Sequence, residues 1–297
     1  MGRIGRWIGA LSLILAVAGC DTKRPAALEK VREGTSRAQV EEYVMAMRLF
    51  DEAIEIDPAC GEAFLRKGIL QLEYDRDASA AIVPLQRATE LMPDSADAFY
   101  QLGSAQLAAG DLASAARSLE SANRIDPSHA NALFRRGQVS ERQGETLVAI
   151  EHYSAAIRSS PREPQGYDAL GALYARFGRF LEASAVFANG IQNNPGSASL
   201  HAAAGAAALD AGELDQAVTW LEAAESLVGA PAAASHNLAV ALATRFERSR
   251  NEADRLRAVE ALGRALTRCN PGSEPARCQS LSARQRELVD AGAPNKR

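Results

Sequence analysis

Four cysteines and four histidines carry the most versatile side-chain chemistry in this sequence. The histidines are scattered, and none has a partner ligand at a spacing typical of a metal site: they are His129, His152, His201 and His236. No phosphate-binding loop, nucleophile elbow or paired-carboxylate motif is visible. The sequence therefore predicts no catalytic site, no metal site and no cofactor, and we expect a protein that is not an enzyme.

Cys20 ends a segment with the three-part layout of a secretory signal, MGRIGRWIGALSLILAVAGC. Its apolar run, Trp7 to Ala18, is too short to span a bilayer comfortably. Its end, Val17-Ala18-Gly19-Cys20, resembles the lipobox of bacterial lipoproteins, in which the cysteine is acylated and becomes the first residue after cleavage. The resemblance implies a signal peptide over residues 1–20 and a lipid anchor on Cys20. An uncleaved leader or a buried apolar helix is the alternative.

Residues 21–35 read as a polar tether between this anchor and the rest of the chain. Asp21 follows the cysteine directly, which resembles the enterobacterial signal for inner-membrane retention. Other lineages do not follow that scheme, so the inner and the outer membrane both stay open. We expect a periplasm-facing protein held by lipid in a bacterial cell envelope.

A period of 34 residues runs through the middle of the chain. Proline, two glycines and an alanine recur with this one period, at Pro93, Pro127, Pro161 and Pro195, at Gly103, Gly137, Gly171 and Gly205, at Gly110, Gly144, Gly178 and Gly212, and at Ala115, Ala149, Ala183 and Ala217. Repetition on this scale indicates an array of one small structural unit and overrides a domain count based on length.

The repeating unit, G-x(6)-G-x(4)-A-x(3)-[LYF]-x(2)-A/G-x(4)-P, resembles the tetratricopeptide motif, a helix-turn-helix repeat. The resemblance implies an all-α fold: a right-handed superhelical solenoid of about six to seven units with a C-terminal capping helix. The physical roles agree. Gly103 lets the first helix approach the second closely, Gly110 ends the first helix at a turn, and Leu119 fills space between the helices.

We expect the solenoid over residues 36–271. Its units are 36–58, which is degenerate, then 59–93, 94–127, 128–161, 162–195, 196–229 and 230–271, and a capping helix with a tail follows at 272–297. In the first unit no turn glycine precedes the second helix, and Ser36 with Gln39 resembles a capping box that opens one long helix. The last unit carries seven extra residues, about two helical turns.

Two cysteines lie on either side of the turn before the expected capping helix. Cys269 ends the last second helix and Cys278 lies early in the cap, so they are placed to form a disulfide in an oxidising compartment. Two reduced, partly buried thiols are the alternative. Cys60 falls in a loop between repeats and has no evident partner.

The tetratricopeptide resemblance also implies which residues bind a peptide. Positions 2, 5, 9, 12 and 13 of the family's unit generally face the concave groove. Carried over to the middle repeats, they include a cluster of aromatic, arginine and other polar side chains, a mixture favoured at binding hot spots: Tyr100, Phe134, Gln138, Glu141, Arg142, Asp168 and Arg176. The competing interpretation is an ordinary solvated helix face with the aromatic rings packed between helices.

The net charge and the order of the sequence features limit the classes of function that this chain could have. A formal charge of −4 argues against nucleic acid as the main partner. Signal peptide, lipobox and tandem repeats together resemble in plan the lipoprotein pilotins that help type IV pilus secretins assemble. This implies a non-catalytic scaffold that binds envelope proteins through its groove, with no small-molecule substrate. An adaptor that recruits cell-wall enzymes and a structural subunit of an envelope complex are the alternatives.

Overall fold

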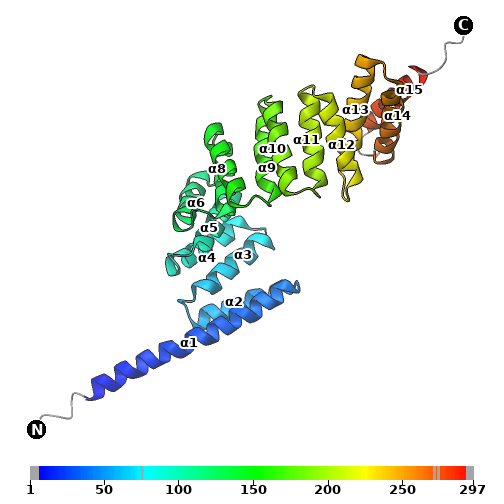
Figure 1. The fold of residues 1–297 in the computed structure, drawn as a ribbon. Helices are drawn as coiled ribbons and strands as arrows, with labels where there is room; N and C mark the ends of the chain where they lie inside the picture. The colour runs from blue at the N-terminus through cyan, green and yellow to red at the C-terminus, as the bar shows by residue number, and fades with distance from the viewer. Residues whose placement is uncertain (1–6, 75, 270–271, 273–274, 292–297) are drawn as a thin grey trace, which may run out of the picture. The chain divides into compact units, whose positions relative to one another are not determined.

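The computed structural model describes residues 7–74, 76–269, 272 and 275–291. Within these ranges the chain forms fifteen α-helices and no strand, so the predicted all-α fold of helix-turn-helix units is confirmed (Figure 1). The chain divides into two compact units, residues 1–159 and 160–297. Each unit is built from helices that pack in consecutive pairs.

The first unit holds four pairs: α1 (Trp7–Gln39) with α2 (Tyr43–Ile56), α3 (Gly61–Glu73) with α4 (Ala78–Leu91), α5 (Ala96–Ala108) with α6 (Leu112–Ile125), and α7 (Ala130–Arg142) with α8 (Thr146–Ser159). The second unit holds three pairs and a last helix: α9 (Pro164–Arg176) with α10 (Phe180–Asn193), α11 (Ala198–Asp210) with α12 (Leu214–Ser226), α13 (Ala232–Ser249) with α14 (Glu252–Thr267), and α15 (Pro275–Ala291).

Within a pair, a missing side chain sets how closely the two helices approach. A Cβ atom on Gly103 of α5 would lie 2.6 Å from Leu119 Cγ on α6, closer than real side-chain atoms approach. The equivalent glycines meet equivalent large side chains, which are Tyr153 at Gly137, Phe187 at Gly171 and Leu221 at Gly205. The expected role of these glycines is confirmed.

The turn inside each pair needs a residue in the left-handed conformation. Gly110 has φ +86° there, and Gly144, Gly178 and Gly212 are equivalent. In three irregular pairs this position is occupied by Glu41, Arg76 and Arg250, with φ values of 63°, 53° and 54°. The left-handed conformation costs a residue with a Cβ atom about 1–2 kcal/mol relative to the right-handed one. The packing of the two helices that flank the turn must therefore stabilise this conformation.

The first helices of the pairs line the inner side of each unit. In the first unit α1 contacts α3, α3 contacts α5 and α5 contacts α7, and in the second α9 contacts α11 and α11 contacts α13. Successive second helices make no comparable contact in the described part of the chain. First helices therefore lie closer together, as expected on the concave side of a stack of helix pairs.

The structure corrects the predicted tether and the start of the first unit. Residues 21–35 are helical and belong to α1, with Ala27 and Val31 buried against the neighbouring helices. Ser36 does not open a helix, because it lies in the last turn of α1 and the next helix begins at Tyr43. Apolar and small residues on one face of α1 drive this packing, since their burial removes apolar surface from water.

The predicted leader falls partly outside the described residues, since residues 1–6 and the Cys20 side chain are not described. The backbone of α1 continues past the end of α2 towards the N-terminus (Figure 1). Among the helices of the described residues, none combines the length and the apolar character that crossing a bilayer requires.

The last pair absorbs its additional residues in its helices. α13 has 18 residues and α14 has 16, against 13 in α9 and 14 in α10. Arg245 of α13 joins the two helices of this pair and also contacts the pair before it. Its Nη2 and Nε donate to the Asp254 carboxylate of α14 at 2.6 and 2.8 Å, and its Nη1 donates to Asp215 of α12 at 2.8 Å. Since the Asp254 side chain is only 4% exposed, this bidentate pair supplies the partner that a buried carboxylate requires.

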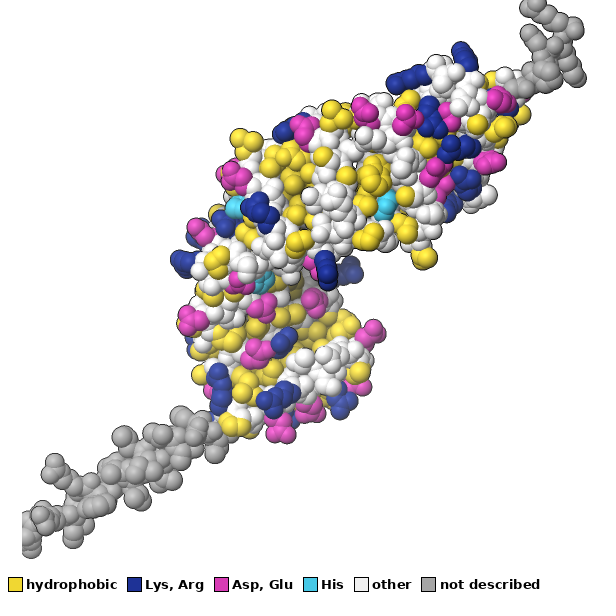
Figure 2. All heavy atoms as spheres, viewed as in Figure 1, with side chains coloured by type: hydrophobic (Ala, Val, Ile, Leu, Met, Phe, Trp, Pro, Cys, Tyr) yellow, Lys and Arg dark blue, Asp and Glu magenta, His cyan; other side chains and the backbone are white. Residues whose placement is uncertain are grey.

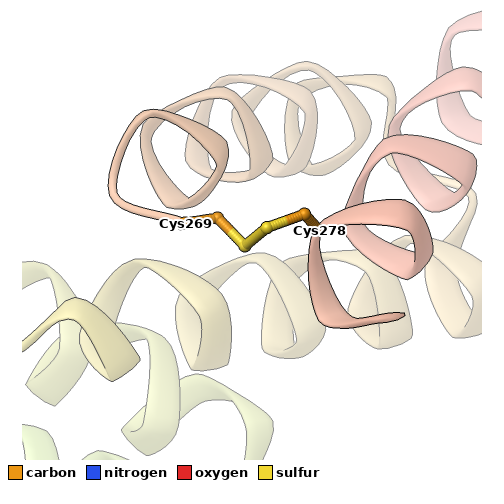
Figure 3. The surroundings of a disulfide bond; sticks show 2 residues. All are labelled: Cys269 and Cys278. Carbon is orange, nitrogen blue, oxygen red and sulfur yellow. A yellow bond between two sulfur atoms is a disulfide. The ribbon is translucent and has the colours of Figure 1, made fainter. Parts of the chain in front are cut away.

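A disulfide ties the last helix to the repeat before it. Cys269, which follows α14, is bonded to Cys278 in the first turns of α15, with the two Cα atoms 5.8 Å apart (Figure 3). Leu281 and Leu288 of α15 are buried in the core of the last pair, and the Leu288 carbonyl accepts a hydrogen bond from Arg255 at 2.6 Å. α15 thus covers the apolar end of the stack, as a solenoid's capping element must.

Replacing Gly103 with alanine should destabilise the protein by about 1–3 kcal/mol, because the new methyl group overpacks the contact with Leu119. The matched control is Gly196→Ala in a loop between repeats, where a Cβ atom meets nothing within 4 Å; it should change the free energy of unfolding by less than about 0.5 kcal/mol. Urea unfolding of both variants measures this. Equal effects would contradict the close-approach argument.

Removing the disulfide should loosen the C-terminal cap before the rest of the chain. A Cys269→Ser, Cys278→Ser variant should lose up to about 3 kcal/mol, the constraint expected from so short a loop. Hydrogen exchange should accelerate first in α15. A reductant should reproduce the effect in the natural chain and do nothing further to the variant; unchanged exchange in α15 would show that packing alone holds the cap.

Candidate functional site

The seven residues predicted to bind a peptide all lie on first helices. Tyr100 is on α5, four residues are on α7, and Asp168 and Arg176 are on α9. The set is therefore divided between the two units, with α5 and α7 in the first and α9 in the second.

On α7, two of the predicted residues serve the packing of their own pair. The Phe134 ring lies against Tyr153 of α8, with ring centroids 5.6 Å apart. Tyr153 is buried, and its hydroxyl donates to Glu141 Oε2 at 2.7 Å. A buried phenol needs such an acceptor, so Glu141 has a structural task whether or not it also meets a ligand.

The other predicted residues of the first unit also have neighbours. Arg142 Nη1 donates to the Leu107 carbonyl near the end of α5 at 3.0 Å and so joins two repeats. The Tyr100 ring lies 5.0 Å from that of His129, the residue before α7. Gln138 accepts a hydrogen bond from Arg135 at 2.9 Å. These contacts favour the packed-ring interpretation for part of the set.

On α9 the two predicted residues lie near solvent. Asp168 is exposed to solvent, but its carboxyl group is partly surrounded by protein. This partial burial raises the pKa of the Asp168 carboxyl above the ordinary value for aspartate. The Arg176 guanidinium lies over the Phe177 ring, 5.5 Å from its centroid. An aspartate that is easier to neutralise than usual, and an arginine over an exposed ring two helical turns further on, give this helix a mixed polar and aromatic surface.

The structure adds a cleft that the sequence analysis did not identify. It lies between α1 and α3 on the inner side of the first unit and has a volume of ≈520 Å³. Its walls come from the last two turns of α1, the N-terminal part of α2, the C-terminal part of α3 and the turn after α3: Thr35, Ala38, Gln39, Tyr43, Phe50, Arg66, Ile69, Leu70, Glu73, Tyr74 and Arg76.

A second hollow extends this cleft along α1 towards the N-terminus. It measures ≈380 Å³ and shares Thr35, Gln39 and Arg66 with the first; its other walls are Leu28, Val31, Arg32, Ser36 and Glu62. From Leu28 to Gln39 the helix rises about 16 Å. That length suits about five residues of an extended peptide or three turns of a helix.

The cleft mixes aromatic, apolar and charged side chains. Tyr43 and Tyr74 stack at its mouth with centroids 4.2 Å apart, and Tyr74 is 50% exposed. Arg66 is paired with Glu62 at 2.8 Å across one helical turn. Three apolar residues close to Gln39 and Tyr43 in the sequence are exposed: Val40, Val44 and Met45. Tyrosine, methionine and arginine are enriched where proteins bind proteins.

The sequence did carry a signal for this site. Ala27, Val31, Gly34 and Ala38 recur at the spacing of one helix face, and the first three are buried while Ala38 packs on the same cluster. That spacing predicts a helix, now seen as α1, that packs on the next helices of the chain. The groove between α1 and α3 is a consequence of this packing. The tether predicted for residues 21–35 does not take this spacing into account.

A family model for the tetratricopeptide repeat matches residues 73–128, 100–164 and 169–235, more than half of the chain. No curated protein matches the sequence.

Several solved structures resemble the fold. MamA is 26% identical with a TM-score of 0.50, over 55% of this chain and 94% of that one. PilW, described as a widely conserved type IV pilus biogenesis factor, is 18% identical with a TM-score of 0.58, over 66% and 91%. A tetratricopeptide repeat protein from Parabacteroides merdae is 13% identical with a TM-score of 0.56, over 87% and 99%. The last two likenesses concern the fold alone.

Replacing Asp168 with asparagine should raise the thermal midpoint at pH 7. Burial raises the pKa of this carboxyl in the folded chain, so its ionisation opposes folding above the ordinary aspartate range and has no effect below it. The gain should therefore shrink as the pH falls. Asp94→Asn in an exposed turn is the control, and a gain for Asp168→Asn that is independent of pH would contradict the assignment.

Proposed function

This chain belongs to the tetratricopeptide repeat family, and we propose that it is a lipid-anchored scaffold of the bacterial cell envelope. Its first repeats bind a polypeptide segment of another envelope protein and hold that protein in place while a complex assembles, such as a pilus secretin. Scaffolds of this family bind proteins and are generally non-catalytic.

The observation that carries the proposal is the cleft between α1 and α3. It is open, elongated and lined by both aromatic and charged residues, which suits a peptide that contributes apolar side chains and backbone hydrogen bonds together. A small-molecule site would be expected to enclose its ligand more completely. The exposed Tyr74 ring and the exposed Arg76 side chain supply the anchors that interfaces favour.

Two further observations support the cellular setting. The lipobox-like sequence ending at Cys20 lies within α1, just before Arg24 and Ala27, the residues where this helix contacts the rest of the first unit. The fold is similar to that of PilW, a pilus biogenesis factor, and the same role here is consistent with that likeness.

An adaptor that recruits cell-wall enzymes would use the same cleft and differs only in the partner. A structural subunit is favoured by a separate observation: Val83, Leu147 and Leu181 on second helices are 70%, 74% and 61% exposed. Scattered apolar residues are normal on protein surfaces, so we rank this third.

Crosslinking in the native host tests the cleft. A photoreactive residue at Gln39 should capture an envelope protein, identified by mass spectrometry, whereas one at the exposed Glu120 of α6 should not. Capture of a secretin or another pilus component supports the assembly role, and capture of a cell-wall enzyme supports the adaptor. Capture at Glu120 with none at Gln39 would overturn the cleft proposal.

With the captured partner purified, Tyr74→Ala should weaken binding about tenfold, because truncating an aromatic residue at a binding hot spot costs about 1.4 kcal/mol or more. Tyr174→Ala on α9, outside the cleft, is the control.

The lipid anchor is tested by Cys20→Ser, which should abolish incorporation of labelled palmitate and release the protein from membranes.

A further inference from the structure

The folded part of the first repeat begins very close to the expected lipid anchor. Arg24 Nη1 donates to the Ala59 carbonyl at 2.6 Å and to Asp57 Oδ2 at 3.2 Å, in the turn between α2 and α3. Ala27 is fully buried one helical turn later. Three residues, Asp21, Thr22 and Lys23, separate Cys20 from Arg24.

Pro25 gives an independent reason for a helix start at this point. Proline lies inside α1 as a continuous helix from Trp7, a position where it removes a hydrogen bond and crowds the preceding turn. In a chain that starts at Cys20, the same proline falls in the first turns of the helix, where it is well tolerated. Cleavage would leave a helix whose own sequence favours beginning near Arg24.

Further contacts fix α1 to the body of the first repeat. Lys30 of α1 pairs with Glu52 of α2 at 2.7 Å, and Val31 is 4% exposed. The helix therefore cannot swing freely about the turn at Asp57 and Ala59. Any membrane attachment at Cys20 is transmitted to the whole repeat through a segment too short to act as a flexible spacer.

We propose that the bilayer surface lies against the end of the first repeat formed by Arg24 and the Asp57–Cys60 turn, so that the cleft meets only partner segments close to the membrane. This inference rests on the proposed lipid anchor. Three linking residues reach at most about 14 Å, and α1 rises about 22 Å from Arg24 to Gln39. Whatever the tilt of α1, its end at the cleft, Gln39, lies within about 36 Å of the Cys20 Cα atom.

This distance between Cys20 and the cleft limits which partner segments the cleft can bind. A polypeptide segment at the edge of a membrane-embedded complex, or in the first residues after a membrane span, falls inside it. A segment of a protein anchored to the opposite membrane must extend nearly to the membrane that holds this chain. The shortness of the link also raises the effective concentration of the cleft for partners in the same bilayer.

Energy transfer on vesicles tests the geometry. The full lipidated protein is placed in phosphatidylethanolamine and phosphatidylglycerol vesicles that carry an acceptor dye on the headgroups. A donor dye is attached through an unnatural amino acid at Glu55, in the last turn of α2, or at Val44, in its first turn; both side chains are exposed. The two positions lie about 16 Å apart along one helix.

We expect clearly more transfer from Glu55 than from Val44. Inserting twenty glycine and serine residues between Thr22 and Lys23 should lower both values and remove the difference between them. Equal transfer from the two sites in the natural chain, or transfer that the insertion does not change, would overturn the inference.

Failure of the anchor is recognised separately. A Cys20→Ser protein that still floats with the vesicles, or a natural chain that incorporates no labelled palmitate, would refute the proposed lipid anchor before any donor is measured. A protein that is lipidated and yet shows equal transfer refutes only the short link.

Discussion

The close approach of two helices at a glycine is the contact on which every other part of this structure depends. Because Gly103 has no side chain, the Leu119 side chain of the facing helix fits against its backbone. The same contact between a glycine and a large side chain recurs in neighbouring pairs. It fixes the thickness of each pair, and stacking of equally thick pairs brings successive first helices together on one side. A binding surface on that inner side is a consequence of this packing.

A stack of identical pairs leaves an apolar face at each end, and the two ends of this chain differ. At the C-terminal end a disulfide, buried leucines and the Arg245–Asp254 pair hold α15 and the lengthened last pair in place. Figure 2 shows acidic and basic side chains gathered together over these helices. At the N-terminal end no added element plays this part in the described residues; α1 is the first helix of the first pair, and its residues also form a wall of the cleft.

The cleft lies in two of the three irregular pairs. The turns of the first two pairs use Glu41 and Arg76 in the left-handed position that glycine occupies in the middle of the array, and the stacked Tyr43 and Tyr74 flank the same region. Departures from a repeat consensus that cost stability are expected where a chain is used for binding. The regular middle repeats, by contrast, use Phe134, Glu141 and Arg142 to satisfy their own packing.

The sequence alone determined the all-α repeat architecture, because the requirements of a turn glycine, a thin contact and a helix-ending proline are local and recur every 34 residues. Tertiary structure decided how far the first helix extends, that Glu41 adopts a left-handed turn, and that a cleft exists between α1 and α3. It also decided which predicted binding residues have partners inside the fold. These features depend on contacts between residues far apart in the chain, whose burial no local pattern specifies.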